Sequence, residues 1–161
     1  MNVDPADFTD EALRKIAPRC GCCEDGGDVS LAQGQMIYPN RPDLWNAPDG
    51  SIRWWWLCGK CWGYVGTHRG TLKPLGSPAD KPTRQAREAA HAAFDPLWQR
   101  KIQRDGCTKQ KARNAGYKWL ASQLGIDRKD CHIGMMNADM ARRVVEIIRN
   151  RPTTNDRIAA G

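Results

Sequence analysis

The chain has 161 residues and a formal net charge of +7, from 25 lysine and arginine residues and 18 aspartate and glutamate residues. This length suits one compact domain or a small domain with an extension, and no stretch reaches the roughly 18 apolar residues of a membrane span. The first ten residues are acidic and lack the apolar segment of a secretory signal, so we expect a cytoplasmic protein whose cysteines stay reduced.

Positive charge is concentrated in the second half of the chain. Residues 1–80 carry 8 basic and 10 acidic residues, a net charge of −2, whereas residues 81–161 carry 17 and 8, a net charge of +9. This asymmetry favours a polyanionic partner, with DNA or RNA first. A solvated surface that aids solubility explains the same charge without any partner.

The first half combines a short helix with strand-like segments. Thr9 has the side chain of a helix N-cap, and Pro18 is suited to end the helix that follows. Clusters of proline, asparagine and aspartate separate the strand-like segments. The predicted elements are a helix at 9–17, a Cys/Gly turn at 19–28, and strands at 29–38, at 51–57 and within 62–70.

The second half shows three stretches with the apolar spacing of amphipathic helices. The first spans about 82–104 and contains Pro96, which is expected to kink the helix or to split it in two. Thr108 is suited to cap a second helix that ends near Leu124, and Asn137 to cap a third that ends before Pro152.

Two pairs of cysteines, Cys20 with Cys23 and Cys58 with Cys61, have C-x-x-C spacing, and 34 residues separate the pairs. Each such turn directs two thiolates to one ion, and two turns complete a tetrahedral site with Zn–S distances of about 2.3 Å. Because four cysteines leave no open position on the metal, the pattern predicts one structural Zn²⁺ ion.

Three alternatives to this ligand set stay open. Cys22 can replace Cys23 if the first pair is a C-x-C turn, and an iron–sulfur cluster also uses four cysteines. Free or redox-active thiols are the third, although a redox C-x-x-C needs only one pair. Cys107 and Cys131 have no partner at ligand spacing and are expected to be ordinary thiols.

The predicted fold is therefore α+β: a zinc ribbon-like β module followed by a three-helix unit packed against it. A proline-rich segment at 73–82 marks the boundary. The predicted parts are an N-terminal helix at 1–17, a zinc-binding β module at 18–73, a basic helical unit at 82–150 and a disordered tail at 151–161.

Several motifs occur in a fixed order. They are Cys58-x-x-Cys61-x-Gly63-Tyr64-Val65-Gly66-x-His68-x-Gly70-Thr71, Pro74-Leu75-Gly76, Arg84-x-x-Arg87-x-x-x-His91-x-x-Phe94-Asp95-x-x-Trp98, Tyr117-x-Trp119-Leu120-Ala121 and His132-Ile133-Gly134-Met135. In these residues the chain resembles the zinc-finger-containing domain family of phage and prophage proteins, over about residues 20–150. Thr67 stands where many relatives have cysteine. The resemblance implies zinc binding, a phage or prophage origin and hence a bacterial host cytoplasm, but no activity.

One helix of the second half carries a second, polar stripe. Its members follow one another at helical spacing: Arg84, Arg87, His91 and Asp95. The arginines suit a phosphate backbone, whereas the His91–Asp95 pair suits proton transfer in a hydrolase, with His68 or His132 as a further group. A solvated face, or a polar seam against the zinc module, explains the stripe without a function.

Two further groups are candidates for binding. The densest positive segment offers charges for phosphates, as Arg100, Lys101, Arg104, Lys109, Lys111, Arg113 and Lys118. Three consecutive tryptophans, Trp54, Trp55 and Trp56, cannot all be buried on one side of a small sheet, so one is expected to stack on a base or to anchor a protein partner. Core packing around the metal is the alternative.

These features lead to three hypotheses about function. The first is a zinc-containing accessory protein of phage type that binds DNA or RNA through its basic helices. The second is a protein–protein module that docks on a host protein or defence complex through an exposed tryptophan and the loop at 39–50. The third is a nuclease or other hydrolase centred on His91 and Asp95.

Overall fold

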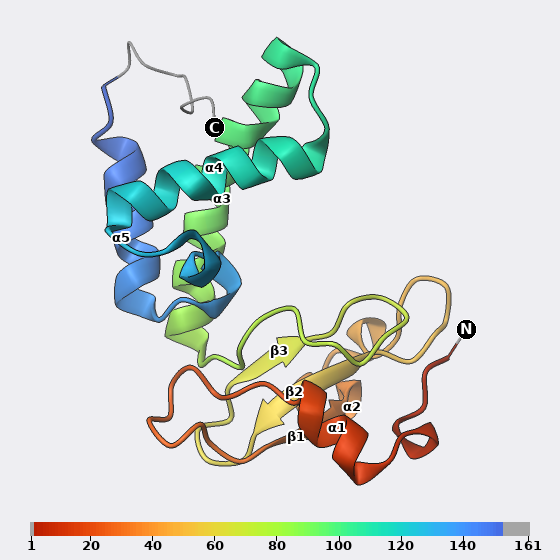
Figure 1. The fold of residues 1–161 in the computed structure, drawn as a ribbon. Coiled ribbons are helices and arrows are strands. Elements are labelled where there is room, and N and C mark those ends of the chain that lie inside the picture. Colours follow the sequence, from red (N-terminus) through yellow and green to blue (C-terminus); the bar gives the residue numbers. More distant parts are fainter. Residues whose placement is uncertain (1, 153–161) are drawn as a thin grey trace. The chain divides into compact units, whose positions relative to one another are not determined.

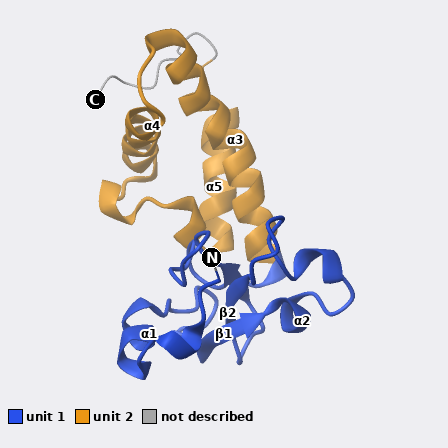
Figure 2. Cartoon of the chain, turned by 90° about the vertical axis from the view of Figure 1, so that its right-hand side faces the viewer, with its two compact units in different colours: residues 1–81 blue, residues 82–161 orange. Residues whose placement is uncertain are grey.

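A computed structural model describes residues 2–152 of the chain. The chain divides into two compact units, residues 1–81 and residues 82–161 (Figure 2). The first unit contains the only sheet of the described residues, and the second is helical. Most of the tail predicted at 151–161 lies outside the described residues, which end at Pro152.

The first unit is built on a three-stranded antiparallel sheet in the order β1-β2-β3 (Figure 1). The strands are β1 (Val29–Gln33), β2 (Trp54–Cys58) and β3 (Tyr64–Gly66). In the middle of the sheet, Trp56 of β2 pairs with Leu31 on one side and with Val65 on the other. Successive residues of a strand point to opposite faces. Both faces of β2 are covered, since every residue of the strand from its second position onward is buried.

Short helices occupy much of the rest of the first unit. They are η1 (Pro5–Asp7), α1 (Asp10–Ile16), α2 (Gly34–Ile37) and η2 (Pro42–Leu44). The prediction of a helix capped by Thr9 is confirmed, because the Thr9 hydroxyl accepts a hydrogen bond from the Ala12 N–H at 3.1 Å.

The strand predicted at 29–38 is wrong in its second half, where the chain enters α2 at Gly34. A Cβ atom on this glycine would lie 2.4 Å from the Cα of Trp45, so the close approach of the two backbones requires glycine. The strands predicted at 51–57 and within 62–70 are present in shorter form, as β2 and β3.

The second unit contains the three predicted helices, α3 (Lys81–Asp105), α4 (Lys109–Leu124) and α5 (Ala138–Arg149). Thr108 and Asn137 cap α4 and α5 as predicted, by accepting hydrogen bonds from the N–H groups of Lys111 and Met140. Pro96 lies inside α3, which continues through it, so the helix is not split. The turns η3 (Arg128–Asp130) and η4 (Ile133–Met135) lie between α4 and α5.

The second unit has its own apolar core, to which all three helices and η4 contribute. Phe94, Leu120, Ile133 and Val144 are fully buried in it. The rings of Phe94 and Tyr117 lie 4.6 Å apart between centroids, which is contact distance for aromatic side chains. The sheet of the first unit and the helices of the second confirm the predicted α+β class. Among residues 2–152, no helix combines the length and apolarity that crossing a membrane requires.

Candidate metal centre

The first cysteine pair lies in the turn that precedes β1. The Cys20 N–H donates to the Gly26 carbonyl at 2.8 Å, and the Gly26 N–H donates to the Cys23 carbonyl at 2.9 Å, which closes the turn. Gly27 follows with a left-handed φ of +70°. A Cβ atom there would lie 2.6 Å from the Sγ of Cys58, so glycine is required both by the backbone and by the cluster.

The second pair begins where β2 ends. The Cys58 N–H donates to the Gly63 carbonyl at 2.8 Å, and the Trp62 N–H donates back to the Cys58 carbonyl at 2.9 Å. The Gly63 N–H in turn donates to the Cys61 Sγ at 3.3 Å. Trp62 has a φ of 61°, in the left-handed region that residues with a side chain rarely adopt. The tight turn between Cys58 and Gly63 requires this conformation.

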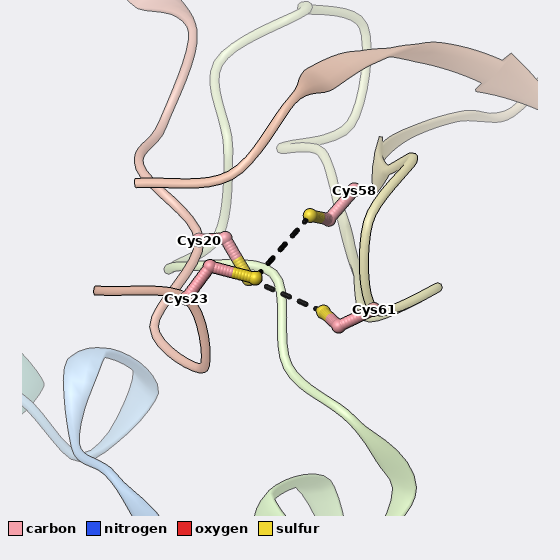
Figure 3. A group of neighbouring side chains, drawn as sticks. All are labelled: Cys20, Cys23, Cys58 and Cys61. Carbon is pink, nitrogen blue, oxygen red and sulfur yellow. Dashed lines mark hydrogen bonds between the residues drawn. The ribbon is translucent and has the colours of Figure 1, made fainter. Parts of the chain in front are cut away.

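The four sulfur atoms converge on one point between the two turns (Figure 3). All of them lie within 4.8 Å of one another. The Cys20 and Cys61 Sγ atoms are 3.4 Å apart, and those of Cys23 and Cys58 are 3.9 Å apart. A tetrahedral site with Zn–S bonds of about 2.3 Å has sulfur atoms about 3.8 Å apart, and the observed distances lie on either side of that value.

The electrostatics of the cluster call for a cation. Burial raises the pKa of Cys58, but backbone hydrogen bonds, chiefly from Cys61 and Lys60, outweigh it and lower the pKa to about 6. Burial, with hydrogen bonds to its neighbours, raises the pKa of Cys23 to about 11, and burial also raises the pKa of Cys61. These directions favour the thiolate at Cys58 and the neutral thiol at Cys23 and Cys61, and a bound metal ion would offset the charge of their thiolates.

The donor set therefore fits one structural zinc ion held by four cysteines. Such a site is closed, so the ion stabilises the fold and offers no position for a substrate. Among the described residues, this is the only group of three or more potential metal-ligating side chains.

The remaining cysteines lie apart from the cluster. Cys22 is exposed, and its Sγ accepts a hydrogen bond from the Asp80 N–H at 3.4 Å, so the structure brings Cys23 rather than Cys22 to the other three. Cys131 is buried in the core of the second unit, and Cys107 is half-buried.

A charged pair joins the two cysteine turns from outside. Lys60 lies between the cysteines of the second turn and donates to the carboxylate of Asp25, which lies two residues after Cys23 in the first turn. The hydrogen bond from Lys60 holds the pKa of Asp25 below its usual range. The pair is exposed, so it serves mainly to fix the two turns relative to each other.

One of the three consecutive tryptophans was predicted to be exposed for stacking or partner contact, with core packing as the alternative, and of the three only Trp54 is not buried. Trp55 and Trp56 are buried, because the covering of both faces of β2 leaves neither ring outside. Trp54 is half-buried, and its indole Nε1 donates to the Val3 carbonyl at 2.9 Å. The most exposed tryptophan is Trp62, which is 66% exposed and was not among the predicted contacts.

In the polar stripe predicted on α3, the structure contradicts an exposed, phosphate-binding position for Arg87 alone. Arg87 is only 7% exposed, and its Nε donates to the Met136 carbonyl at 2.7 Å, which ties α3 to the segment before α5. His91 and Asp95 do form a pair, with 3.6 Å between Nδ1 and the carboxylate, but Asp95 also accepts from the Trp98 Nε1. Arg84 is half-buried beside them.

His68 and His132, proposed as further groups for a hydrolase, are both exposed. His68 belongs to the first unit, whereas His91, Asp95 and His132 belong to the second. The His132 ring packs against Tyr117, with 5.7 Å between centroids. His132 therefore contacts an aromatic ring of α4, and among the described residues no third potential metal-ligating side chain joins His91 and Asp95.

Seven basic residues of α3 and α4 were predicted to bind phosphates, and one of them, Lys101, does not lie on the surface. It is buried, and its ammonium donates to the Asp105 carboxylate at 2.9 Å. The other six are exposed: Arg100, Arg104, Lys109, Lys111, Arg113 and Lys118. Sequence reasoning missed Arg128, which the turn η3 brings to α4, where its Nη2 donates to the Asn114 side chain at 2.7 Å. No periodicity marks that turn in the sequence.

Comparison with protein-family models identifies the family of the chain. A family model described as a zinc-finger-containing domain matches residues 17–151, which cover most of the chain. No curated protein and no solved structure matches the chain.

Proposed function

We propose that this chain, which belongs to the zinc-finger-containing domain family, is a zinc-stabilised accessory protein that binds nucleic acid through α4. In this proposal, zinc orders the weakly apolar first unit, and the second unit supplies the charge. A phage or prophage origin remains a prediction from the resemblance.

One observation carries the proposal: α4 has four basic residues and no acidic residue among its 16 positions. Helices of soluble proteins usually mix both signs on their exposed faces. Lys111 and Lys118 lie seven residues apart, two turns along one face, with Asn114 between them. The phosphates of a nucleic acid offer charge of the opposite sign at regular intervals along such a face.

The same face lines a groove of about 560 Å³. Its lining combines three cationic side chains, Lys111, Lys118 and Arg128, with the amides of Gln110 and Asn114, and includes no carboxylate. Arg128 is held in place by Asn114 and by the ring of Tyr117, 5.0 Å from its guanidinium carbon. A groove with cations and neutral donors favours phosphate oxygens over any cationic or apolar ligand.

A double variant, Lys111→Gln with Lys118→Gln, tests the proposal. Fluorescence anisotropy with labelled single-stranded DNA, duplex DNA and single-stranded RNA gives affinity over a range of salt concentrations. We expect weaker binding and a slope of log K against log salt that is shallower by about 1.5, or about 0.7–0.9 for each phosphate that the variant no longer neutralises.

The matched control is Arg143→Gln with Arg149→Gln, which removes the same charge from exposed positions of α5. If binding depends only on the net charge of the protein, the control should lose as much affinity as the variant with Lys111→Gln and Lys118→Gln. If none of the three nucleic acids binds the wild-type protein at low salt, the proposal is wrong.

A protein partner is the second candidate, favoured by Trp62. Trp62 is 66% exposed, so its indole presents apolar surface to the solvent. Its backbone is held in the left-handed region, which lowers the stability of the fold. Exposed tryptophans are common anchors of protein interfaces. Trp62→Ala would then abolish capture of a specific host protein, and unchanged capture would count against this candidate.

A further inference from the structure

We propose that a cavity in the first unit binds a single nucleotide, with the base against Trp54 and the phosphate against Arg53. The cavity encloses about 360 Å³ and lies beside the start of β2. This volume is at the lower end of the roughly 300–1,000 Å³ of small-molecule sites, so it suits one nucleotide better than a dinucleotide. It uses only residues of the first unit, so it is independent of the groove on α4.

The aromatic and apolar side of the cavity is rigid. Trp54 lines it, and the hydrogen bond from its Nε1 to the Val3 carbonyl at 2.9 Å fixes the indole ring. Ile52 and Pro48 line the same cavity, and the Ile52 N–H is held by the Asn2 side chain at 3.0 Å. A fixed indole beside apolar side chains is suited to the faces of a nucleobase, because every base stacks on aromatic rings.

The polar side of the cavity comes from Arg53 and His68. Both residues line the cavity and are exposed, and among the described residues no carboxylate forms an ion pair with Arg53. The backbone of His68 is fixed, since its N–H donates to the Lys73 carbonyl at 2.9 Å and its carbonyl accepts from the Thr71 hydroxyl at 3.0 Å. A guanidinium without a partner, with an imidazole in the same lining, suits a phosphate monoester.

The two loops that form the walls are joined across the cavity. Arg69 donates to the Asp49 carboxylate at 2.8 Å, and that carboxylate also accepts from the Ser51 hydroxyl and N–H. These hydrogen bonds, that of Ser51 first, hold the pKa of Asp49 well below its usual range. The charge of the Asp49 carboxylate is therefore compensated by Arg69, and the loops need little reordering when a ligand binds.

Isothermal titration of the zinc-loaded full-length protein tests this site. The probes are adenosine 5′-monophosphate, inorganic phosphate and a short oligothymidylate. We expect adenosine 5′-monophosphate to bind at least tenfold more tightly than phosphate, because only the nucleotide has a base to stack. Arg53→Gln should weaken nucleotide binding by about tenfold, and so should Trp54→Leu.

Lys73→Gln is the matched control, since it removes one exposed charge from the same unit outside the cavity lining. It should change the affinity less than twofold. Because Arg53 is exposed, its variant should keep the wild-type melting temperature, which makes it the deciding variant if Trp54→Leu unfolds. Equal losses from Arg53→Gln and Lys73→Gln would overturn the proposal.

The two sources of the ligand are separated by the two nucleotide probes. Binding of adenosine 5′-monophosphate that depends on Arg53 supports a site for free nucleotides. Binding of oligothymidylate alone, again dependent on Arg53 and retained in the Lys111→Gln, Lys118→Gln variant, supports a site for an unstacked nucleotide of a strand. If neither probe binds in a way that depends on Arg53, the inference is wrong, whatever the groove on α4 binds.

Discussion

The sulfur atoms of Cys20 and Cys61 lie 3.4 Å apart, although 41 positions separate the two residues in the chain. The segment between them contains two of the three strands of the sheet, β1 and β2. A metal ion bound to both sulfur atoms therefore closes a long loop of the chain. Closing a long loop removes more conformational entropy from the unfolded chain than closing a short one.

Removal of the metal should unfold the first unit and spare the second. We expect one zinc ion per chain by elemental analysis, and a strong chelator should abolish the tertiary signal of the buried tryptophans of β2. The helical signal should largely remain, because the second unit has a core of its own. A protein without stoichiometric metal, or one with an unchanged melting temperature in chelator, would contradict the metal site.

Gly27→Ala should disrupt the cluster by contact. The added Cβ would meet the Cys58 Sγ at 2.6 Å, in addition to the cost of about 1–2 kcal/mol for a left-handed residue with a side chain. Gly50→Ala is the control, because it has the same sign of φ, +83°, and nothing within 4 Å of the new atom. Chemical denaturation should show a larger loss of stability for the first variant, together with loss of zinc, and equal losses would exclude a steric cause.

Arg87→Met should destabilise the second unit without affecting nucleic-acid binding. It removes a buried donor and leaves the Met136 carbonyl without the hydrogen bond at 2.7 Å, at a cost of about 1–3 kcal/mol. Lys118→Gln, at an exposed position, should do the reverse: a shallower salt dependence with unchanged stability. Urea denaturation and anisotropy measured on both variants provide the check.

Asp105 should make the stability of the second unit sensitive to acid. Hydrogen bonds from Arg104 and then Lys101 hold the pKa of this carboxyl below its usual 3.8 in the folded protein. A lowered pKa means that the stabilisation is complete above about pH 4 and is lost as the pH falls through the folded-state pKa. Asp105→Asn should therefore melt at a lower temperature near neutral pH and show a smaller further loss in acid. Parallel curves for the two proteins would contradict this role.

Trp62→Gly should leave the fold as stable as the wild type or make it more stable. The left-handed φ of 61° is unfavourable for tryptophan and free of strain for glycine, and the exposed indole contributes little burial. Trp56→Ala, in contrast, should cost about 3–5 kcal/mol, because that ring is buried. A marked fall in melting temperature for Trp62→Gly would show that the indole packs on the protein.

Local signals in the sequence were sufficient for α1, α3, α4 and α5 and for the cysteine cluster. Thr9, Thr108 and Asn137 cap the helices that they were predicted to cap, since a cap depends on the next three residues alone. The spacing within each C-x-x-C turn likewise limits how the sulfur atoms can point, so their meeting around one point follows from two local turns and a sheet.

The burial of charged side chains depends on contacts that the sequence does not show. Helical periodicity assigned Arg87 to a polar face, but the segment before α5 covers that face and supplies the Met136 carbonyl. Lys101 is buried as well, and its ammonium pairs with Asp105 one turn away along α3. The sequence did not indicate the cavity beside Trp54 either, because its walls come from two loops that are distant in sequence and are joined by the pair of Arg69 with Asp49.

The hydrogen bonds that Asn2 and Val3 make to Ile52 and Trp54 have a practical consequence for handling the protein. Proteolytic trimming of the amino terminus by three residues would free the indole ring and remove one wall of the cavity. A protein that begins at Asp4 should therefore bind the nucleotide more weakly than the untrimmed protein, while the zinc content of the two stays equal.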